Sequence, residues 1–250
     1  MGNRLSTLWQ LPDTSLQSNG NGVSDPFLAS LSRTVTVSWT PDIIFHGSPR
    51  APILIALAHG AGAGMDSPFM DQVSSGLAER GLRVARFEFP YMQRSRQTGK
   101  RRPPDRAAVL METWQAVIKN LQRRLKTGNK KLVIGGKSMG GRIASMVAAE
   151  ANVAGLVCLG YPFHPPGKPV GQRIEHLRRL AVPTLILQGE RDPFGTRREV
   201  VRYRISAAIQ LQWLTDGNHS FKPPKVSAAS NDDNLTQALD AMATFVKQLP

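Results

Sequence analysis

Short, continuously apolar runs alternate along this chain with longer segments that have the character of helices. Residues 52–58 and 153–160 are almost entirely apolar, which is typical of central parallel strands covered by helices on both faces. Shorter apolar runs predict further strands at 132–134, 183–187 and 211–214, and a partly polar segment predicts another at 82–89. The pattern therefore favours a sheet whose inner strands are buried on both sides.

The segments between these runs predict the helices that would cover such a sheet. Helices are expected at 66–80 and 232–249, and a third after Pro104 and Asp105, which are typical of a helix start. The apolar face of this third helix would hold Leu110, Trp114, Val117, Leu121 and Leu125. Strand and helix alternate without internal repeats, so the sequence predicts one α/β domain with a mostly parallel, doubly wound sheet.

The boundaries of this domain and its connecting segments are predicted from the same patterns. Residues 1–30 are rich in polar residues and lack sustained periodicity, so we expect a flexible arm there and the folded domain at 31–250. Residues 34–39 alternate and predict an edge strand, whereas 94–102 is expected to be a basic loop. Only about 22 residues separate the strands on either side of 161–182. That spacing leaves room for a helix but not for a lid domain, so any site there should be open.

One predicted strand ends abruptly in glycines that surround a serine. Gly136-Lys-Ser138-Met-Gly140 fits the pattern G-x-S-x-G, which forms the nucleophile elbow of serine hydrolases. The flanking glycines would give the strained turn the room it needs, and the following helix would direct its positive end toward Ser138. Ser138 is therefore the candidate nucleophile.

Other interpretations of the glycine-rich segments were weighed. In a chain with 22 glycines, a single G-x-S-x-G match can arise by chance or mark an ordinary turn. A phosphate-binding loop ending at Gly136-Lys137-Ser138 would need glycine at position 131, which is lysine. A dinucleotide fingerprint starting at Gly60 would need glycine at position 65, which is methionine. Nucleotide binding is therefore not expected.

Two further side chains complete a catalytic constellation at the strand ends. Asp192 follows one predicted strand and His219 follows the last one, which gives the chain order Ser, Asp, His. Histidine would accept and return the serine proton, and the carboxylate would orient the ring. Asp216, three residues before His219, is an alternative orienting carboxylate, but it would have to fold back within the histidine's own loop.

The remaining site residues were assigned from their places at strand ends. The backbone N–H groups of Ala61, in a glycine-rich loop, and of Met139, after the serine, would form the oxyanion hole. An apolar wall would come from Phe69, Tyr91, Met92 and Phe163, together with Met139. Lys137 would either add positive potential or point outward. The expected chemistry requires no metal and no cofactor.

Seven motifs together resemble a predicted α/β-hydrolase family of bacteria that is related to testis-expressed protein 30 and, more distantly, to dienelactone hydrolases. The motifs are Leu57-Ala-His-Gly-Ala-Gly62, Arg86-Phe-Glu-Phe-Pro-Tyr-Met92, Gly99-Lys-Arg-Arg-Pro-Pro-Asp105, Gly135-Gly-Lys-Ser-Met-Gly-Gly-Arg142, Leu159-Gly-Tyr-Pro-Phe-His-Pro-Pro-Gly-Lys168, Leu187-Gln-Gly-Glu-Arg-Asp-Pro-Phe-Gly195 and His219-Ser-Phe-Lys-Pro223. The resemblance covers about 33 to 249. It implies an α/β-hydrolase fold and a triad of Ser138, Asp192 and His219, but no particular substrate. Eukaryotic relatives of this family include interaction modules.

The residues and the resemblance together predict a serine-dependent, carboxylesterase-like enzyme that cleaves a carboxylic ester or thioester of a small to medium acyl group. The alternative is a non-catalytic interaction module with the same fold. A scaffold has no need to keep all three triad residue types and both glycine-rich loops.

Charge and cysteine content bear on partners and location. The net charge is +14, and 94–142 holds fourteen Lys and Arg against only Asp105 and Glu112. Such a stretch could attract anions, but it contains no nucleic-acid motif, so we expect a small ester substrate and neither nucleic acid nor membrane as partner. A single cysteine, Cys158, no apolar run long enough to span a membrane and no secretory signal pattern favour the cytoplasm. The sequence does not indicate an oligomeric state.

Overall fold

The computed structural model describes residues 42–125, 131–168 and 173–250. The predicted arm at 1–30 and the predicted edge strand at 34–39 lie outside these residues. The described part belongs to one unit that extends from Thr40 to Pro250. No helix within the described ranges is both long enough and apolar enough to cross a lipid bilayer.

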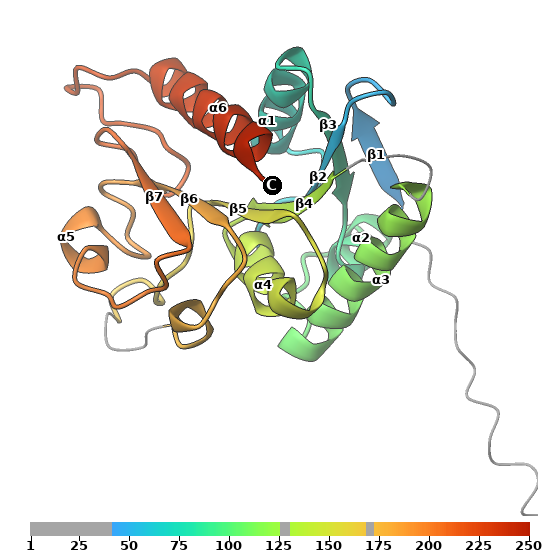
Figure 1. Ribbon diagram of the computed structural model, residues 1–250. Helices are drawn as coiled ribbons and strands as arrows, with labels where there is room; N and C mark the ends of the chain where they lie inside the picture. Colours follow the sequence, from blue (N-terminus) through green and yellow to red (C-terminus); the bar gives the residue numbers. More distant parts are fainter. Residues whose placement is uncertain (1–41, 126–130, 169–172) are drawn as a thin grey trace, which may run out of the picture. The chain divides into compact units, whose positions relative to one another are not determined.

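A seven-stranded sheet forms the middle of this unit, with the strand order β1-β3-β2-β4-β5-β6-β7 (Figure 1). Its strands are β1 (Ile43–His46), β2 (Ile53–Ala58), β3 (Arg83–Phe87), β4 (Lys131–Lys137), β5 (Gly155–Leu159), β6 (Thr184–Gly189) and β7 (Ile209–Leu214). β1 runs antiparallel to β3, and all other pairs are parallel. The prediction of a mostly parallel sheet is therefore confirmed.

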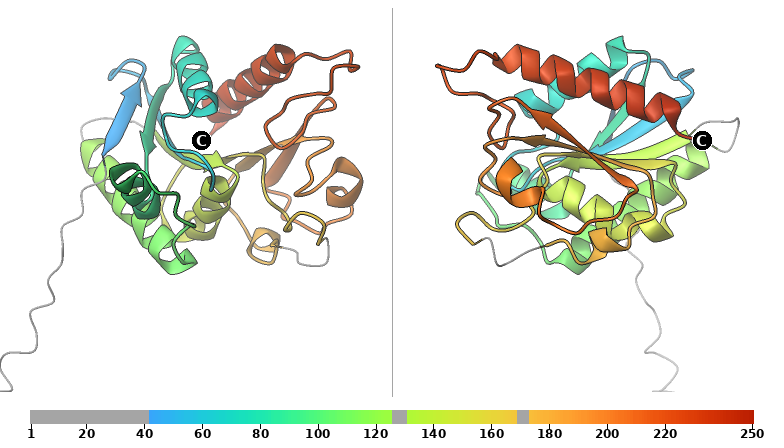
Figure 2. Two further views of the ribbon diagram at one scale, coloured as in Figure 1. Left: turned by 180° about the vertical axis from the view of Figure 1, so that it is seen from behind. Right: turned by 60° about the vertical axis from the view of Figure 1, so that its left-hand side comes forward.

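Strand β2 shows how the sheet acquires two buried faces. Its residues are all buried, and alternate side chains enter different cores. Leu54 contributes to the core beneath α3 (Ala107–Leu125) and α4 (Met139–Val147), whereas Ile55 contributes to the core beneath α1 (Pro68–Glu79) and α6 (Asn231–Gln248). The two helix layers lie on opposite faces of the sheet (Figures 1 and 2). A continuously apolar strand is thus explained by cover on both sides.

The expected basic loop at 94–102 is largely helical, which corrects the sequence prediction. Helix α2 (Pro90–Thr98) starts where β3 was expected to finish and ends at Gly99, which has a φ of 64°. The Ser95 hydroxyl bonds to the Tyr91 carbonyl, and the Thr98 hydroxyl bonds to the Arg94 carbonyl. The remaining short helices are η2 (Ala148–Glu150), η3 (His176–Arg178) and α5 (Arg197–Val200).

The connection between β5 and β6 bears on the expected open site. In its described residues, 160–168 and 173–183, the only helical segment is the single turn η3. This agrees with the prediction that no lid domain is inserted there.

Candidate active site

Ser138 lies on a strained turn between β4 and α4. Its φ of 52° and ψ of −116° fall in a region that non-glycine residues seldom adopt. The two flanking glycines permit this turn, because a Cβ on Gly136 would lie 2.3 Å from the Ala58 carbonyl oxygen and one on Gly140 would lie 2.6 Å from it. The local sequence thus forces the serine side chain out of the strand and above the end of the sheet.

The structure brings Ser138 and His219 together across 81 positions of the chain. Ser138 Oγ lies 2.8 Å from His219 Nε2, and His219 Nδ1 lies 2.8 Å from Asp192 Oδ2. Because an ionised carboxylate only accepts hydrogen bonds, Nδ1 carries the proton and Nε2 accepts from the serine hydroxyl. The three side chains predicted from sequence therefore form one hydrogen-bonded chain.

Asp192 is fully buried and receives several donors. The backbone N–H of Phe194 donates to Oδ1 at 2.9 Å, and Gln188 Nε2 donates to Oδ2 at 2.9 Å. Asp216, the alternative carboxylate, instead accepts a hydrogen bond from Ser227 Oγ at 2.7 Å. The geometry places Asp192, and not Asp216, against the histidine ring.

The surroundings of His219 favour its neutral ring. Burial lowers the pKa of His219 below its ordinary value of 6.5, the charge of Lys137 acts in the same direction, and the hydrogen bond and charge of Asp192 oppose them. The Phe194 ring packs against the imidazole with 4.3 Å between ring centroids. A neutral imidazole that accepts from a serine hydroxyl can act as a general base at neutral pH.

The glycine-rich loop after β2 is held by buried hydrogen bonds. His59 Nδ1 donates to the Gly60 carbonyl at 2.7 Å, and its Nε2 accepts from the Phe89 N–H at 3.1 Å. The Tyr91 hydroxyl donates to the Ala61 carbonyl at 3.1 Å. These contacts fix the backbone at Ala61 beside the serine, as an oxyanion-hole donor would require. Met139, the other predicted donor, is the first residue of α4, so helix geometry gives its N–H no partner four residues back.

Arg96 of α2 supports the same loop from the other side. Its guanidinium lies 2.8 Å from Asp66, just after the loop, and 2.5 Å from Glu88, which is only 2% exposed. Glu88 also accepts from the Met65 N–H at 3.3 Å. Part of the basic stretch therefore pairs with carboxylates at the site and does not form a free positive surface.

A cavity of about 370 Å³ opens directly above Ser138 and His219. It is lined by the glycine loop, the start of α1 and the triad loops: Gly60, Ala61, Gly62, Ala63, Ser67, Pro68, Phe69, Met70, Lys137, Ser138, Phe194, His219 and Ser220. Phe69 lies where the sequence predicted it. Lys137, whose direction the sequence did not decide, lines this cavity and directs its ammonium nitrogen toward the His219 backbone carbonyl.

Four predicted wall residues, Met139 among them, are absent from the lining of this cavity, which corrects the expected wall. Tyr91 is buried and holds the glycine loop, and Phe163 is buried against Tyr161 and Tyr203. Met92 lines a separate hollow beside α2. The sequence analysis also missed Phe194 and Gln188. Gln188 could have been noticed as a polar residue at the end of an otherwise apolar strand.

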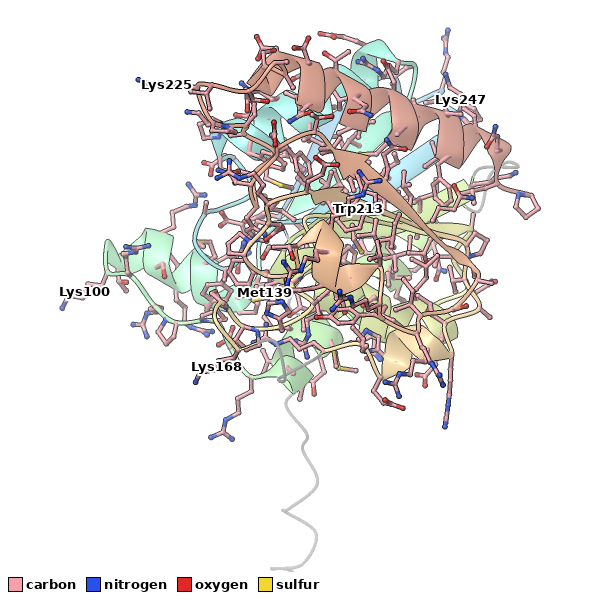
Figure 3. The ribbon with its side chains drawn as sticks, turned by 90° about the vertical axis from the view of Figure 1, so that its left-hand side faces the viewer. Lys100, Met139, Lys168, Trp213, Lys225 and Lys247 are labelled. Atoms are coloured by element: carbon pink, nitrogen blue, oxygen red, sulfur yellow. The ribbon has the colours of Figure 1, made fainter. Side chains whose placement is uncertain are left out.

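Two other features of the described residues are unsuited to this chemistry. Burial raises the pKa of the Cys158 thiol, so this cysteine is not a competing nucleophile. A larger hollow of about 660 Å³ lies between β7 and α6, lined by residues such as Gln212 and Asp240, and it contains none of the triad. Met139, next to the nucleophile, lies near the centre of the face seen in Figure 3.

Three solved structures with similar folds each share at most 20% identity with this chain, so they support the fold alone. A dienelactone hydrolase from Anabaena variabilis has a TM-score of 0.65 and 20% identity, covering 85% of this chain and 94% of its own. A lidless α/β serine hydrolase from Xanthomonas campestris has a TM-score of 0.63 and 19% identity, covering 84% and 90%. An α/β serine hydrolase homologue from Coxiella burnetii has a TM-score of 0.62 and 18% identity, covering 81% and 89%.

The match to a sequence family is more direct. The family described as the alpha/beta hydrolase domain matches residues 51–247. These residues include β2, the elbow and the loops of Asp192 and His219. With its mostly parallel sheet, its serine on a strand-to-helix turn and this match over most of its length, the chain belongs to the alpha/beta hydrolase family.

Proposed function

We propose that this protein is a serine hydrolase that cleaves a carboxylic ester or thioester of a small to medium acyl group. The observation that carries the proposal is the hydrogen-bonded chain from Ser138 Oγ through His219 to Asp192, with 2.8 Å at each step, beneath a cavity. A nucleophile, a general base and a carboxylate that orients the base are the parts of the triad used in nucleophilic acyl transfer.

In the proposed acylation step, Ser138 Oγ attacks the carbonyl carbon of the ester while His219 Nε2 takes the hydroxyl proton. The carbonyl oxygen becomes an oxyanion and receives hydrogen bonds from the N–H groups of Ala61 and Met139. When the tetrahedral species collapses, His219 returns the proton to the departing alcohol or thiol, and the acyl group remains on Ser138 as an ester.

Deacylation repeats these steps with water. His219 removes a proton from water, the hydroxide attacks the acyl carbon, and the carboxylic acid leaves as Ser138 recovers its proton. Asp192 keeps the imidazole in the tautomer with a proton on Nδ1 and stabilises the imidazolium in both steps. Burial of Asp192 and its three donors supports this orienting role.

The cavity supports a compact acyl group as substrate. Its volume of about 370 Å³ lies near the lower end of small-molecule sites, and Phe69, Met70 and Phe194 give it an apolar lining. A cytoplasmic location and the absence of nucleic-acid or membrane partners belong to the same proposal. So does the narrower relationship to testis-expressed protein 30.

A fluorophosphonate probe combined with a panel of short-chain activated esters tests this function. The probe should label the wild-type protein at Ser138, and Ser138→Ala should abolish both labelling and hydrolysis while leaving the melting temperature close to that of the wild type. Ser75→Ala is the matched control, because Ser75 is exposed on α1 and does not line the cavity. A wild-type protein that is neither labelled nor active would instead support the non-catalytic interaction module.

A further inference from the structure

Lys137, the residue between Gly136 and Ser138, has an unusual place for a lysine. It ends β4, its side chain is only 9% exposed, and it lines the cavity above the triad. Its ammonium nitrogen lies 2.6 Å from the backbone carbonyl oxygen of His219. The side chain therefore connects the elbow of the nucleophile to the loop that holds the candidate base.

Two aromatic rings and a backbone carbonyl surround this ammonium group. Nζ lies 5.5 Å from the centre of the Phe69 ring and 6.0 Å from that of Phe221, distances at which aromatic faces attract a cation. Burial lowers the pKa of Lys137 to about 8, against the opposing charge of Asp192, so the group is still mostly charged at pH 7. Lysines are seldom buried without a specific partner, and the partner here is the carbonyl of His219.

The neighbouring strand leaves space for this contact. Gly160, directly after β5, has a φ of 69°, and a Cβ there would lie 2.8 Å from the His219 carbonyl oxygen and 2.9 Å from Lys137 Nζ. Any larger residue at position 160 would push the lysine and the histidine apart. The hydrogen bond is therefore enclosed by β4, the end of β5, α1 and the histidine loop itself.

We propose that Lys137 is a positioning residue that holds His219 in register with Ser138 by donating a hydrogen bond to the His219 backbone carbonyl. The proposal rests on the serine hydrolase function proposed above. The hydrogen bond acts on the loop backbone and not on the ring, so it fixes the place from which the imidazole reaches Oγ. A small displacement of a base from its acceptor distance is costly to the rate.

Lys137 also affects the charge state of the ring that it positions. The charged groups that act on the pKa of His219 are Asp192, which raises it, and Lys137, which lowers it. Removing the lysine charge should therefore raise the pKa of His219. A lysine that only filled space would leave the turnover number unchanged, whereas its charge would still lower the pKa of His219.

The test compares Lys137→Met and Lys137→Gln with the matched control Lys222→Met. Lys222 is exposed on the same loop, three residues after His219. In both Lys137 variants we expect kcat on the pH plateau to fall about tenfold with little change in KM. The acidic limb of kcat/KM should move to higher pH, because the charge of Lys137 no longer lowers the pKa of His219. The control should match the wild type in all three quantities.

Two further measurements keep the outcome decisive. Thermal melting identifies a variant that has lost its fold, and the polar Gln variant replaces the Met variant in that case. NMR titration of the His219 ring reports its pKa without turnover, and a displaced backbone amide resonance of His219 in Lys137→Gln would support the contact even in a protein that cleaves no ester. A folded Lys137 variant with wild-type plateau kcat, or with an unmoved His219 pKa, would overturn the proposal.

Discussion

Gln188 and Asp192, four residues apart, are joined by a buried hydrogen bond of 2.9 Å from Gln188 Nε2 to Asp192 Oδ2. The same oxygen accepts from His219 Nδ1. Gln188 also accepts from the Tyr161 N–H at 2.7 Å and donates to the Gly195 carbonyl at 3.1 Å. The Gln188 side-chain amide thus connects the Asp192 carboxylate to the loops that follow β5 and β6.

Replacing Gln188 by Leu should therefore impair both stability and activity. The variant leaves buried polar groups without their partner, and each such group costs about 1–3 kcal/mol of unfolding free energy. We expect urea denaturation to show a loss of this order and kcat to fall as Asp192 loses one of its fixed donors. Gln210→Leu, on the exposed side of β7, is the control and should change neither quantity. Wild-type kcat in a folded Gln188→Leu protein would show that this amide does not support catalysis.

Asp192→Asn should lower kcat by about 10⁴, the scale known for loss of the orienting carboxylate in triad enzymes. The amide cannot hold the imidazole in the required tautomer in the way that the carboxylate does. Asp216→Asn should have a small effect, because Asp216 bonds to Ser227 and not to the ring. Steady-state kinetics on one activated ester compares the two variants. Greater damage from Asp216→Asn would reverse the assignment.

The pH dependence of kcat/KM should show an acidic limb that reports the free His219 ring. Only the neutral ring accepts the serine proton, so activity rises as the ring loses its proton. Because burial and Lys137 lower the pKa of His219, the midpoint should lie below pH 6.5 and the plateau should be reached near neutrality. A slow ester, for which chemistry limits the rate, is the appropriate substrate. A flat profile from about pH 5 to 9 would rule out His219 as the base.

Arg96→Gln should lower kcat/KM by about tenfold through the glycine-rich loop, although Arg96 does not line the cavity. The variant removes the ion pairs to Asp66 and to the buried Glu88, and so loosens the backbone that carries the Ala61 N–H. Lys100→Gln is the control, since Lys100 points away from the body of the protein beyond α2 (Figure 3). Equal kcat/KM in Arg96→Gln and wild type would show that the loop keeps its position without this support.

The exposed cations after α2 should make the enzyme prefer anionic substrates at low salt. Lys100, Arg101 and Arg102 are exposed, whereas Arg94 and Arg96 pair with carboxylates. We expect kcat/KM for a carboxylated ester to fall as salt rises and that for the matched neutral ester to change little. Replacing all three exposed residues by Gln should remove the difference. Identical salt curves would contradict steering, and inhibition by short oligonucleotides at physiological salt would favour a nucleic-acid partner.

The inner strands and the meeting of Ser138 with His219 were accessible from sequence for clear physical reasons. Strands buried on both faces must be continuously apolar, so β2, β5 and β6 were predicted within about two residues of their observed ends. The elbow requires glycine on both sides of the serine, and a parallel sheet gathers the ends of its strands at one edge. The catalytic roles of these residues remain predictions.

Other parts of the site depend on tertiary contacts that local patterns do not contain. Helix α2 has only one buried side chain, Tyr91, and is supported by ion pairs to residues outside the helix. Its sequence therefore has no apolar stripe from which the helix could have been predicted. Tyr91 and Phe163 follow strands, where the two-residue alternation no longer determines which way a side chain points. Both side chains are buried in the core, and the aromatic residues that line the cavity are instead Phe69 and Phe194. The direction of Lys137 was equally undetermined, because its partner lies 82 residues away.

The order of the triad along the chain has a consequence for folding. The serine elbow precedes β5, whereas His219 lies beyond β7, which is the last strand in the chain and forms one edge of the sheet. A nascent or partly unfolded chain that lacks the β6–β7 pairing presents its serine with no base to activate it. In the proposed mechanism, hydrolysis requires β7 to be paired with β6, so the appearance of turnover during refolding would report that this edge of the sheet has formed.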